Sequence, residues 1–212
     1  MTETQDRLPR GRHKLSRRDV TARQRARMLR AMAEVVTERG YADTPVAAVI
    51  ERAGVSRETF YQQFGSKQDC FVVALEDAIG RLAGALEAVL TSTGGTPIER
   101  YDALLAGYLD TVAARPAIAR LFLIETYAAG PDAMRRRLEL QEQFVDAVVR
   151  IFGARSARGR FGAEALVAAT VSAVTARFIA DDVRGLAALR PKLLALAQTL
   201  FGCEAIRDLG PG

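Results

Sequence analysis

A series of helix start and stop signals, with helical periodicity between them, constrains the fold of this chain most strongly. Thr44-Pro45 and Thr96-Pro97 each place a capping residue directly before a proline, which is typical of a helix start. Between such signals apolar residues recur every three or four positions, as along residues 71–89, and strand-like alternation is absent. The sequence therefore predicts an all-α fold with about nine helices.

Glycine and proline set most of the predicted boundaries. Gly40 offers a left-handed residue to end the first helix, and Arg115-Pro116 and Gly130-Pro131 interrupt later ones. Thr21 and Gln24 have capping-box spacing near the first helix start. The predicted helices cover residues 19–39, 45–53, 57–64, 67–91, 97–114, 116–129, 132–152, 163–184 and 190–201.

Composition excludes several classes of protein. No apolar stretch approaches the roughly 20 residues that span a bilayer, and the arginine-rich start lacks the apolar segment of a signal peptide. The two cysteines, Cys70 and Cys203, are far apart, and His13 is the one histidine, so neither a disulfide framework nor a zinc or histidine-based metal site is expected. We expect a cytoplasmic chain with no metal, no cofactor and no membrane partner.

Positive charge is concentrated near the start of the chain. Ten basic residues and one acid, Asp19, lie between Arg7 and Arg30. This asymmetry favours a polyanion as the partner of the first third of the chain. A solvated basic tail is the alternative that charge alone leaves open.

Residues 44–64 carry the most specific pattern, two short helices joined by a tight turn at Gly54, as in a helix-turn-helix. If Phe60 faces the core, Glu58 and Gln62 point outward at 100° per residue. Gln can bridge adenine, Arg can fork onto guanine, and Glu can accept from cytosine in a major groove. The alternative is a solvated surface on which Glu58 complements the helix dipole.

Residues 20–70 resemble the DNA-binding domain of the tetracycline-repressor (TetR-like) family of bacterial regulators. The resemblance implies a homodimer with three N-terminal helices for DNA and six C-terminal helices for ligand binding and dimerisation. It divides the chain into a basic arm (1–18), a helix-turn-helix domain (19–66), a ligand-binding and dimerisation domain (67–202) and a tail (203–212). The matching positions are Gly40-Tyr41, Thr44, Val46, Arg52–Ser56, Thr59–Tyr61, Phe64, Ser66-Lys67 and Phe71.

The resemblance also assigns roles to single residues. It implies phosphate contacts for three residues, Thr44, Tyr61 and Lys67, and base-facing or groove-lining positions for three others, Arg57, Thr59 and Gln62. Ala47 departs from the longer polar residue that is common in the family, and Ile50 from a small one. The loss at Ala47 leaves more of the phosphate grip to basic residues of the first helix and the arm, with candidates Arg17, Arg18, Arg23 and Arg25, and Arg7, Arg10 and Arg12 for a minor groove.

The C-terminal part matches the family in helix layout alone. The eighth and ninth helices are apolar over more than half their circumference, which predicts burial against the same helices of a second chain. A monomer with a large core is the alternative. Glu125 stands in an apolar context, where it either holds a cationic ligand or pairs with Arg120 or Arg177. The predicted ligand pocket contains Tyr101, Leu105, Tyr108, Phe122, Glu125 and Phe144.

We therefore predict a one-component transcriptional regulator. In the primary hypothesis it is a repressor that leaves a pseudo-palindromic operator on double-stranded DNA when an unknown small-molecule effector binds. A ligand-independent regulator and an activator are the alternatives, and an enzyme is a remote one. No metal-binding HxxxH, nucleophile-elbow or phosphate-loop motif is present, and we predict no catalytic residue.

Overall fold

The computed structural model describes residues 16–91 and 94–202, except for the side chains of residues 81–83 and 85–90. This part of the chain is helical throughout, which confirms the predicted all-α class and the count of nine α-helices there. The α-helices are α1 (Arg17–Arg39), α2 (Val46–Ala53), α3 (Arg57–Gln63), α4 (Lys67–Leu90), α5 (Pro97–Ala114), α6 (Pro116–Leu123), α7 (Pro131–Phe152), α8 (Ala157–Ile179) and α9 (Leu189–Phe201), with short 3-10 helices η1 (Glu125–Tyr127) and η2 (Val183–Leu186).

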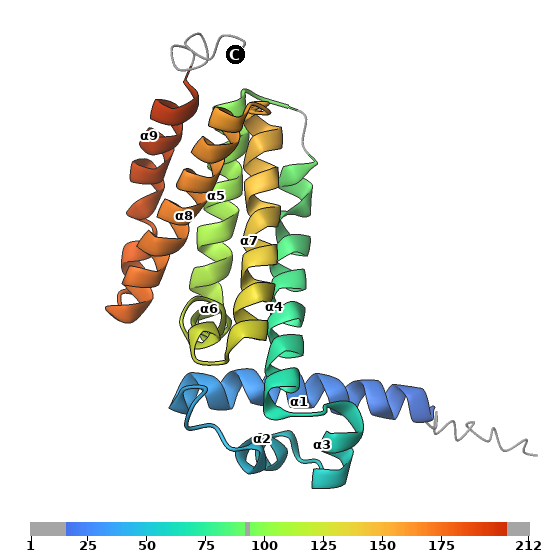
Figure 1. Ribbon diagram of the computed structural model, residues 1–212. Helices are drawn as coiled ribbons and strands as arrows, with labels where there is room; N and C mark the ends of the chain where they lie inside the picture. Colours follow the sequence, from blue (N-terminus) through green and yellow to red (C-terminus); the bar gives the residue numbers. More distant parts are fainter. Residues whose placement is uncertain (1–15, 92–93, 203–212) are drawn as a thin grey trace, which may run out of the picture.

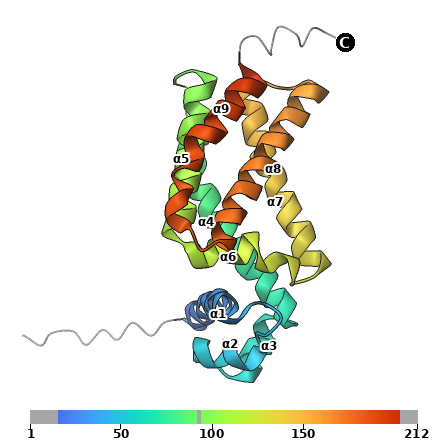
Figure 2. The same ribbon diagram turned by 90° about the vertical axis from the view of Figure 1, so that its left-hand side faces the viewer.

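The helices form a small base and a tall bundle (Figure 1). α1 lies crosswise under the bundle, and α2 and α3 lie on its far side. α4 begins beside α3 and rises into the bundle, so one continuous helix belongs to both parts. After a 90° turn, α8 and α9 are seen side by side on one face of the bundle, next to α7 and α5 (Figure 2).

The hydrophobic core of the base continues into the bundle. Met32 on α1 and Phe60 on α3 are fully buried, and they belong to the same cluster as Phe71 on α4 and Leu121 on α6. A second cluster joins α5, α7, α8 and α9 higher in the bundle. The predicted boundary between residues 66 and 67 coincides with the start of α4, but the packing is continuous across it.

Two predicted helix starts are wrong by one or two residues. α1 begins at Arg17 because the Ser16 hydroxyl accepts a hydrogen bond from the Asp19 backbone N–H (3.1 Å), and the Asp19 carboxylate accepts one from the Ser16 backbone N–H (3.1 Å). This is the capping box, in place of the predicted Thr21 and Gln24. α2 has Pro45 at its N-cap position, without a side-chain cap, because the Thr44 hydroxyl donates instead to the Gly40 carbonyl (2.7 Å).

Later boundaries also differ from the prediction, most of all at α6 and α8, and α8 ends at Ile179, five residues before the predicted end at 184. α6 ends at Leu123, and a 3-10 turn follows where a helix to residue 129 was expected. α8 starts at Ala157, six residues early, because the Ser156 hydroxyl accepts from the Gly159 N–H (3.1 Å). Gly159 lies inside the helix rather than in a loop: a Cβ there would lie 2.9 Å from the Ala154 Cβ, so close packing requires the glycine.

α8 corrects the prediction that no apolar stretch approaches the length that spans a bilayer. Of the helices in residues 16–91 and 94–202, it alone is long and apolar enough to cross a membrane, by length and composition only. Core helices of soluble proteins pass the same test, and α8 buries Leu166 and Phe178 between its neighbours. Phe161 and Ile179, at its two ends, are nevertheless 70% and 71% exposed.

Candidate DNA-binding surface and effector cavity

The turn before α3 fixes the direction in which this short helix points. Gly54 adopts the left-handed conformation (φ 61°, ψ 47°) that a side chain disfavours. The Ser56 hydroxyl then caps α3 by accepting from the Thr59 N–H (3.1 Å). Phe60 is fully buried beneath the helix. The opposite face of α3 therefore points away from the rest of the molecule, at the lower end in Figure 1.

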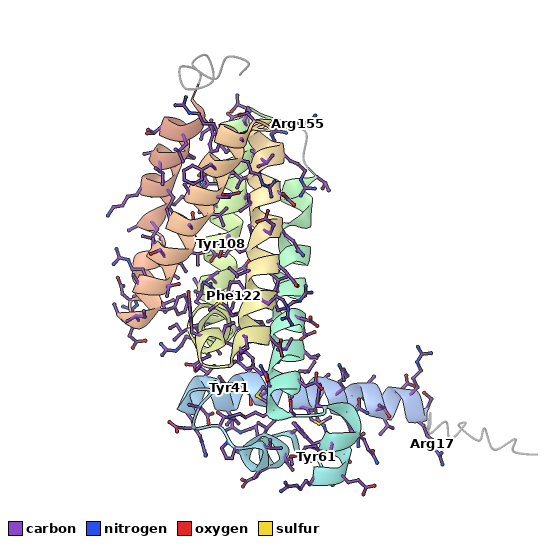
Figure 3. All side chains as sticks on the ribbon, in the orientation of Figure 1. Arg17, Tyr41, Tyr61, Tyr108, Phe122 and Arg155 are labelled. Carbon is purple, nitrogen blue, oxygen red and sulfur yellow. The ribbon has the colours of Figure 1, made fainter. Side chains whose placement is uncertain are left out.

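Most of the predicted DNA-contacting residues lie on this outer face. Arg57, Glu58 and Gln62 are exposed, and Tyr61 is 45% exposed at the foot of the molecule (Figure 3). The Gln62 amide donates to the Glu58 carboxylate (3.2 Å), and the Arg57 guanidinium lies 5.5 Å from the centre of the Tyr61 ring. Thr59 is half-buried and its hydroxyl is 2.9 Å from that of Ser56, within the cap.

Arginines of α1 extend the positive surface beside α3. The Arg25 guanidinium donates to the Gln63 carbonyl (3.3 Å) and lies 4.7 Å from the centre of the Phe64 ring, so it holds the end of α3. This positioning role was not predicted. Three of the other predicted phosphate contacts on α1 are exposed, namely Arg17, Arg18 and Arg23. The predicted minor-groove residues Arg7, Arg10 and Arg12 lie outside the described residues.

Thr44 and Lys67 sit differently from the α3 residues. Thr44 is 1% exposed, and its hydroxyl is already bonded to Gly40, so a phosphate contact through this side chain has no support in the geometry. Lys67, at the start of α4, donates to the Tyr41 carbonyl (2.9 Å) and lies 4.2 Å from the centre of its ring. Its role as a phosphate contact stays a prediction, since an ammonium has two further donors.

Five of the six predicted pocket residues line one cavity inside the bundle. Its walls are almost wholly apolar, and it encloses about 650 Å³ of non-atom space, part of which is open to solvent. Figure 3 labels two residues of the cavity, Tyr108 and Phe122, halfway up the bundle. Burial raises the pKa of Tyr108 and of Tyr101 to about 12, so both phenols stay neutral at physiological pH. The predicted residues that line it are Tyr101, Leu105, Tyr108, Phe122 and Phe144.

The sequence of the base matches a known family. The family model described as "Bacterial regulatory proteins, tetR family" matches residues 28–74, which run from α1 into α4 and include the whole helix-turn-helix. The chain belongs to the TetR family. It is a DNA-binding transcriptional regulator and not an enzyme.

Proteins that are similar over most of the chain, beyond the helix-turn-helix, agree with this membership. The HTH-type transcriptional activator FasR of Mycolicibacterium smegmatis is 28% identical over 152 residues, 69% of this chain and 68% of its own. FadR of Bacillus subtilis, solved in complex with stearoyl-CoA, has a TM-score of 0.72 at 19% identity, covering 81% of this chain and 96% of that one. The fatty acid degradation regulator FadR of Bacillus halodurans has a TM-score of 0.71 at 17% identity, with 81% and 96% covered. The TetR-like fold therefore extends over the bundle.

Glu125 occupies neither of the positions predicted for it in this TetR-family chain. It is absent from the cavity lining, and its carboxylate accepts a hydrogen bond from the Tyr41 backbone N–H (2.7 Å). Arg120 instead donates to the Phe178 carbonyl (3.1 Å), and Arg177 pairs with Asp182 (2.6 Å). The prediction was wrong because the partner of Glu125 is a backbone group 84 residues away, which no local pattern indicates.

The residues around Tyr41 join the two parts of this TetR-family regulator. Glu125 binds its N–H, Lys67 binds its carbonyl, and its ring packs edge-on against Phe71 (4.9 Å between ring centres). Figure 3 shows Tyr41 at the level where the base meets the bundle. α1, α4 and η1 therefore meet at one residue, between the DNA-binding face and the cavity.

Seven residues that line the cavity were not predicted from the sequence. Their apolar side chains lie at core spacing on helices, so they are indistinguishable from other core residues in the sequence. Gln141 gave the one available signal, as a polar residue on the inner side of α7. The missed lining residues are Ile79, Leu104, Gln141, Val148, Val167, Thr170 and Val171.

Proposed function

We propose that this TetR-family regulator binds a pseudo-palindromic operator as a homodimer and responds to an amphipathic small molecule held in the bundle cavity. The observation that carries the proposal is the outer face of α3. Arg57, Glu58 and Gln62 are exposed there on a seven-residue helix that is too short to be stable by itself. A cap, a left-handed turn and a buried phenylalanine hold that face outward, as reading of a major groove requires.

The exposed face of α8 supports the homodimer. Phe161 and Ile179 are large apolar side chains left mostly in water, at the two ends of the helix. Between them the exposed positions are small, Ala165, Ala168 and Ser172, so the helix of a second chain can approach closely. A two-fold contact through α8 and α9 would cover this face and present two copies of α3. In the simplest geometry the two copies lie roughly 34–36 Å apart, one turn of DNA.

The cavity supports an effector with an acyl chain or a similar apolar part. Its lining is apolar, and a smaller apolar cavity shares three of its walls, Ile79, Tyr108 and Phe122. The structurally similar FadR of Bacillus subtilis holds stearoyl-CoA. Both observations favour a fatty acid or its coenzyme A thioester over a polar metabolite.

Operator binding is the direct test. Full-length protein is titrated against a labelled duplex that carries an inverted repeat from the DNA upstream of its gene, and anisotropy is recorded. We expect saturable binding by two chains per repeat, with a loss of about 1–3 kcal/mol for each substituted base pair that the protein reads. A duplex with one scrambled half-site is the control. Equal affinity for the intact and the scrambled duplex would contradict the proposal.

Repression is the direction we propose, because a dimer over a promoter excludes polymerase without further contacts. Activation is the second candidate, favoured by one observation: the relative FasR is an activator. In vitro transcription from the promoter beside the operator separates the two. A fall in transcript with added protein supports repression, and a rise supports activation.

A further inference from the structure

Arg137 on α7 is a buried cation without an anion. It is 5% exposed, its Nε makes no hydrogen bond, and none of the carboxylates whose side chains the structure describes pairs with it. Its neighbours on α7 are satisfied: Arg135 pairs with Asp132 (2.7 Å), and Arg136 pairs with Glu139 (2.8 Å). An unpaired charge removed from water destabilises the folded protein, so proteins rarely keep one without a use for it.

The guanidinium of Arg137 lies over two aromatic rings. Its carbon lies 5.0 Å from the centre of the Tyr127 ring and 5.5 Å from that of Phe122. Cation–π contacts of this kind hold a guanidinium in place but leave the N–H donors at its edge unused. A planar fork with free donors fits the two oxygens of a carboxylate or phosphate.

Arg137 also lies where the apolar cavity opens to a more polar groove. It lines a groove between α7 and α8, and two residues, Gln141 and Val171, line both the groove and the cavity. Burial raises the pKa of Tyr108 in the cavity, and the nearby positive charge of Arg137 offsets part of that rise. Phe122, one of its two ring neighbours, is a wall of the cavity itself.

We propose that Arg137 binds the anionic group of an amphipathic effector whose apolar part lies in the bundle cavity. This rests on the proposed function, which places the effector there. The anion is a carboxylate or a phosphate, and Gln141 lies beside it as a further polar group. The groove also borders the α8 face proposed for dimerisation, through Ala168 and Ser172, so a partner chain would close the groove over a small head group.

Isothermal titration of the full-length protein tests the assignment. The ligands are chains of ten to eighteen carbons, each as the free carboxylate, the coenzyme A thioester and the uncharged alcohol. We expect R137Q to weaken binding of the preferred anion at least tenfold and to leave binding of the matching alcohol within twofold of wild type. R135Q is the matched control, because Arg135 is an exposed arginine two positions away.

The ligand arms separate the two sources of the anion. Tighter binding of the free acid assigns a carboxylate to Arg137, and tighter binding of the thioester assigns a phosphate. The proposal is overturned if R137Q binds the anion as tightly as wild type, if it loses the alcohol equally, or if no chain binds the wild type. Operator binding by ligand-free wild type is measured alongside, and its absence would instead overturn the proposed function.

A measurement without ligand provides a second test. If no group of the protein compensates the charge, R137M should leave the melting temperature of the ligand-free protein unchanged or raise it, because methionine fills similar space without a charge. A carboxylate of the partner chain is the other way to satisfy this arginine. In that case R137M would lower the melting temperature and weaken the dimer, and the proposal would be wrong.

Discussion

The hydrogen bond between Glu125 and Tyr41 joins the base of the molecule to the bundle through one side chain. A carboxylate from η1 accepts the N–H of Tyr41 at 2.7 Å, while Lys67 of α4 donates to the carbonyl of the same residue. Gly40 passes directly beneath, and a Cβ there would lie 3.6 Å from the Glu125 carboxylate. The backbone N–H and the backbone carbonyl of Tyr41 thus both bind side chains of other elements, and these two bonds attach the loop after α1 to η1 and α4.

Replacing Glu125 should therefore loosen the base from the bundle. We expect E125A to lower the free energy of unfolding by about 1.5–3 kcal/mol, the usual range for a hydrogen bond to a charged group. E125Q keeps an acceptor oxygen and should recover most of that loss. Urea denaturation followed by circular dichroism measures both. Equal stability of E125A and wild type would show that this contact contributes nothing.

At the scale of the element, α3 separates positioning from base reading. Its buried side holds Phe60, its cap uses Ser56 and Thr59, and its exposed side holds Arg57 and Gln62. Phosphate contacts set where a protein lies on DNA, and contacts to base edges set which sequence it prefers. Substitutions on the two edges of this seven-residue helix should thus have different effects: one edge should set the affinity for all DNA, and the other should set the preferred sequence.

Substitutions on α3 test this division. We expect Y61F to weaken binding to all duplexes alike, because it removes a hydroxyl that can contact phosphate. R57A and Q62A should instead reduce discrimination at particular base pairs by about 1–3 kcal/mol each. Competition with duplexes substituted one base pair at a time measures both effects. If Y61F and Q62A give the same pattern, the assigned roles are wrong.

At the scale of the whole molecule, the exposed face of α8 is where we propose the contact between two chains. Stable protein interfaces bury about 800 Å² on each partner, and charged residues are depleted at their centres. A charge placed at the centre of such a face would lose its hydration without gaining a partner, and this desolvation penalty would destabilise the dimer. The exposed residues of α8 allow a charge to be placed on this face, and its effect on the oligomeric state can be measured directly.

A168E should accordingly dissociate the protein. We expect wild type to elute in light-scattering chromatography with twice the chain mass of 23.0 kDa, and A168E to elute with the mass of one chain. A103E, at an exposed alanine of α5, is the control and should remain a dimer. A168E should also lose most of its operator affinity. A dimeric A168E would contradict the placement of the interface.

Much of this protein could be predicted because the relevant signals are local. Thr96 caps its helix as predicted, and Gly54 has the left-handed conformation expected of the turn. A cap, a turn and a 100° periodicity each involve residues within four positions of one another. The outward face of α3 and five of the six predicted cavity residues follow from those signals and from the resemblance they support.

Tertiary structure alone decided which distant groups meet. Glu125 binds a backbone group 84 residues away, and Arg137 is buried over two rings with no described carboxylate paired with it. Each of these depends on how helices pack, and many sequences with the same local periodicity allow several packings. The sequence by itself thus determined the elements and their faces, and the packed bundle determined the partners of its charges.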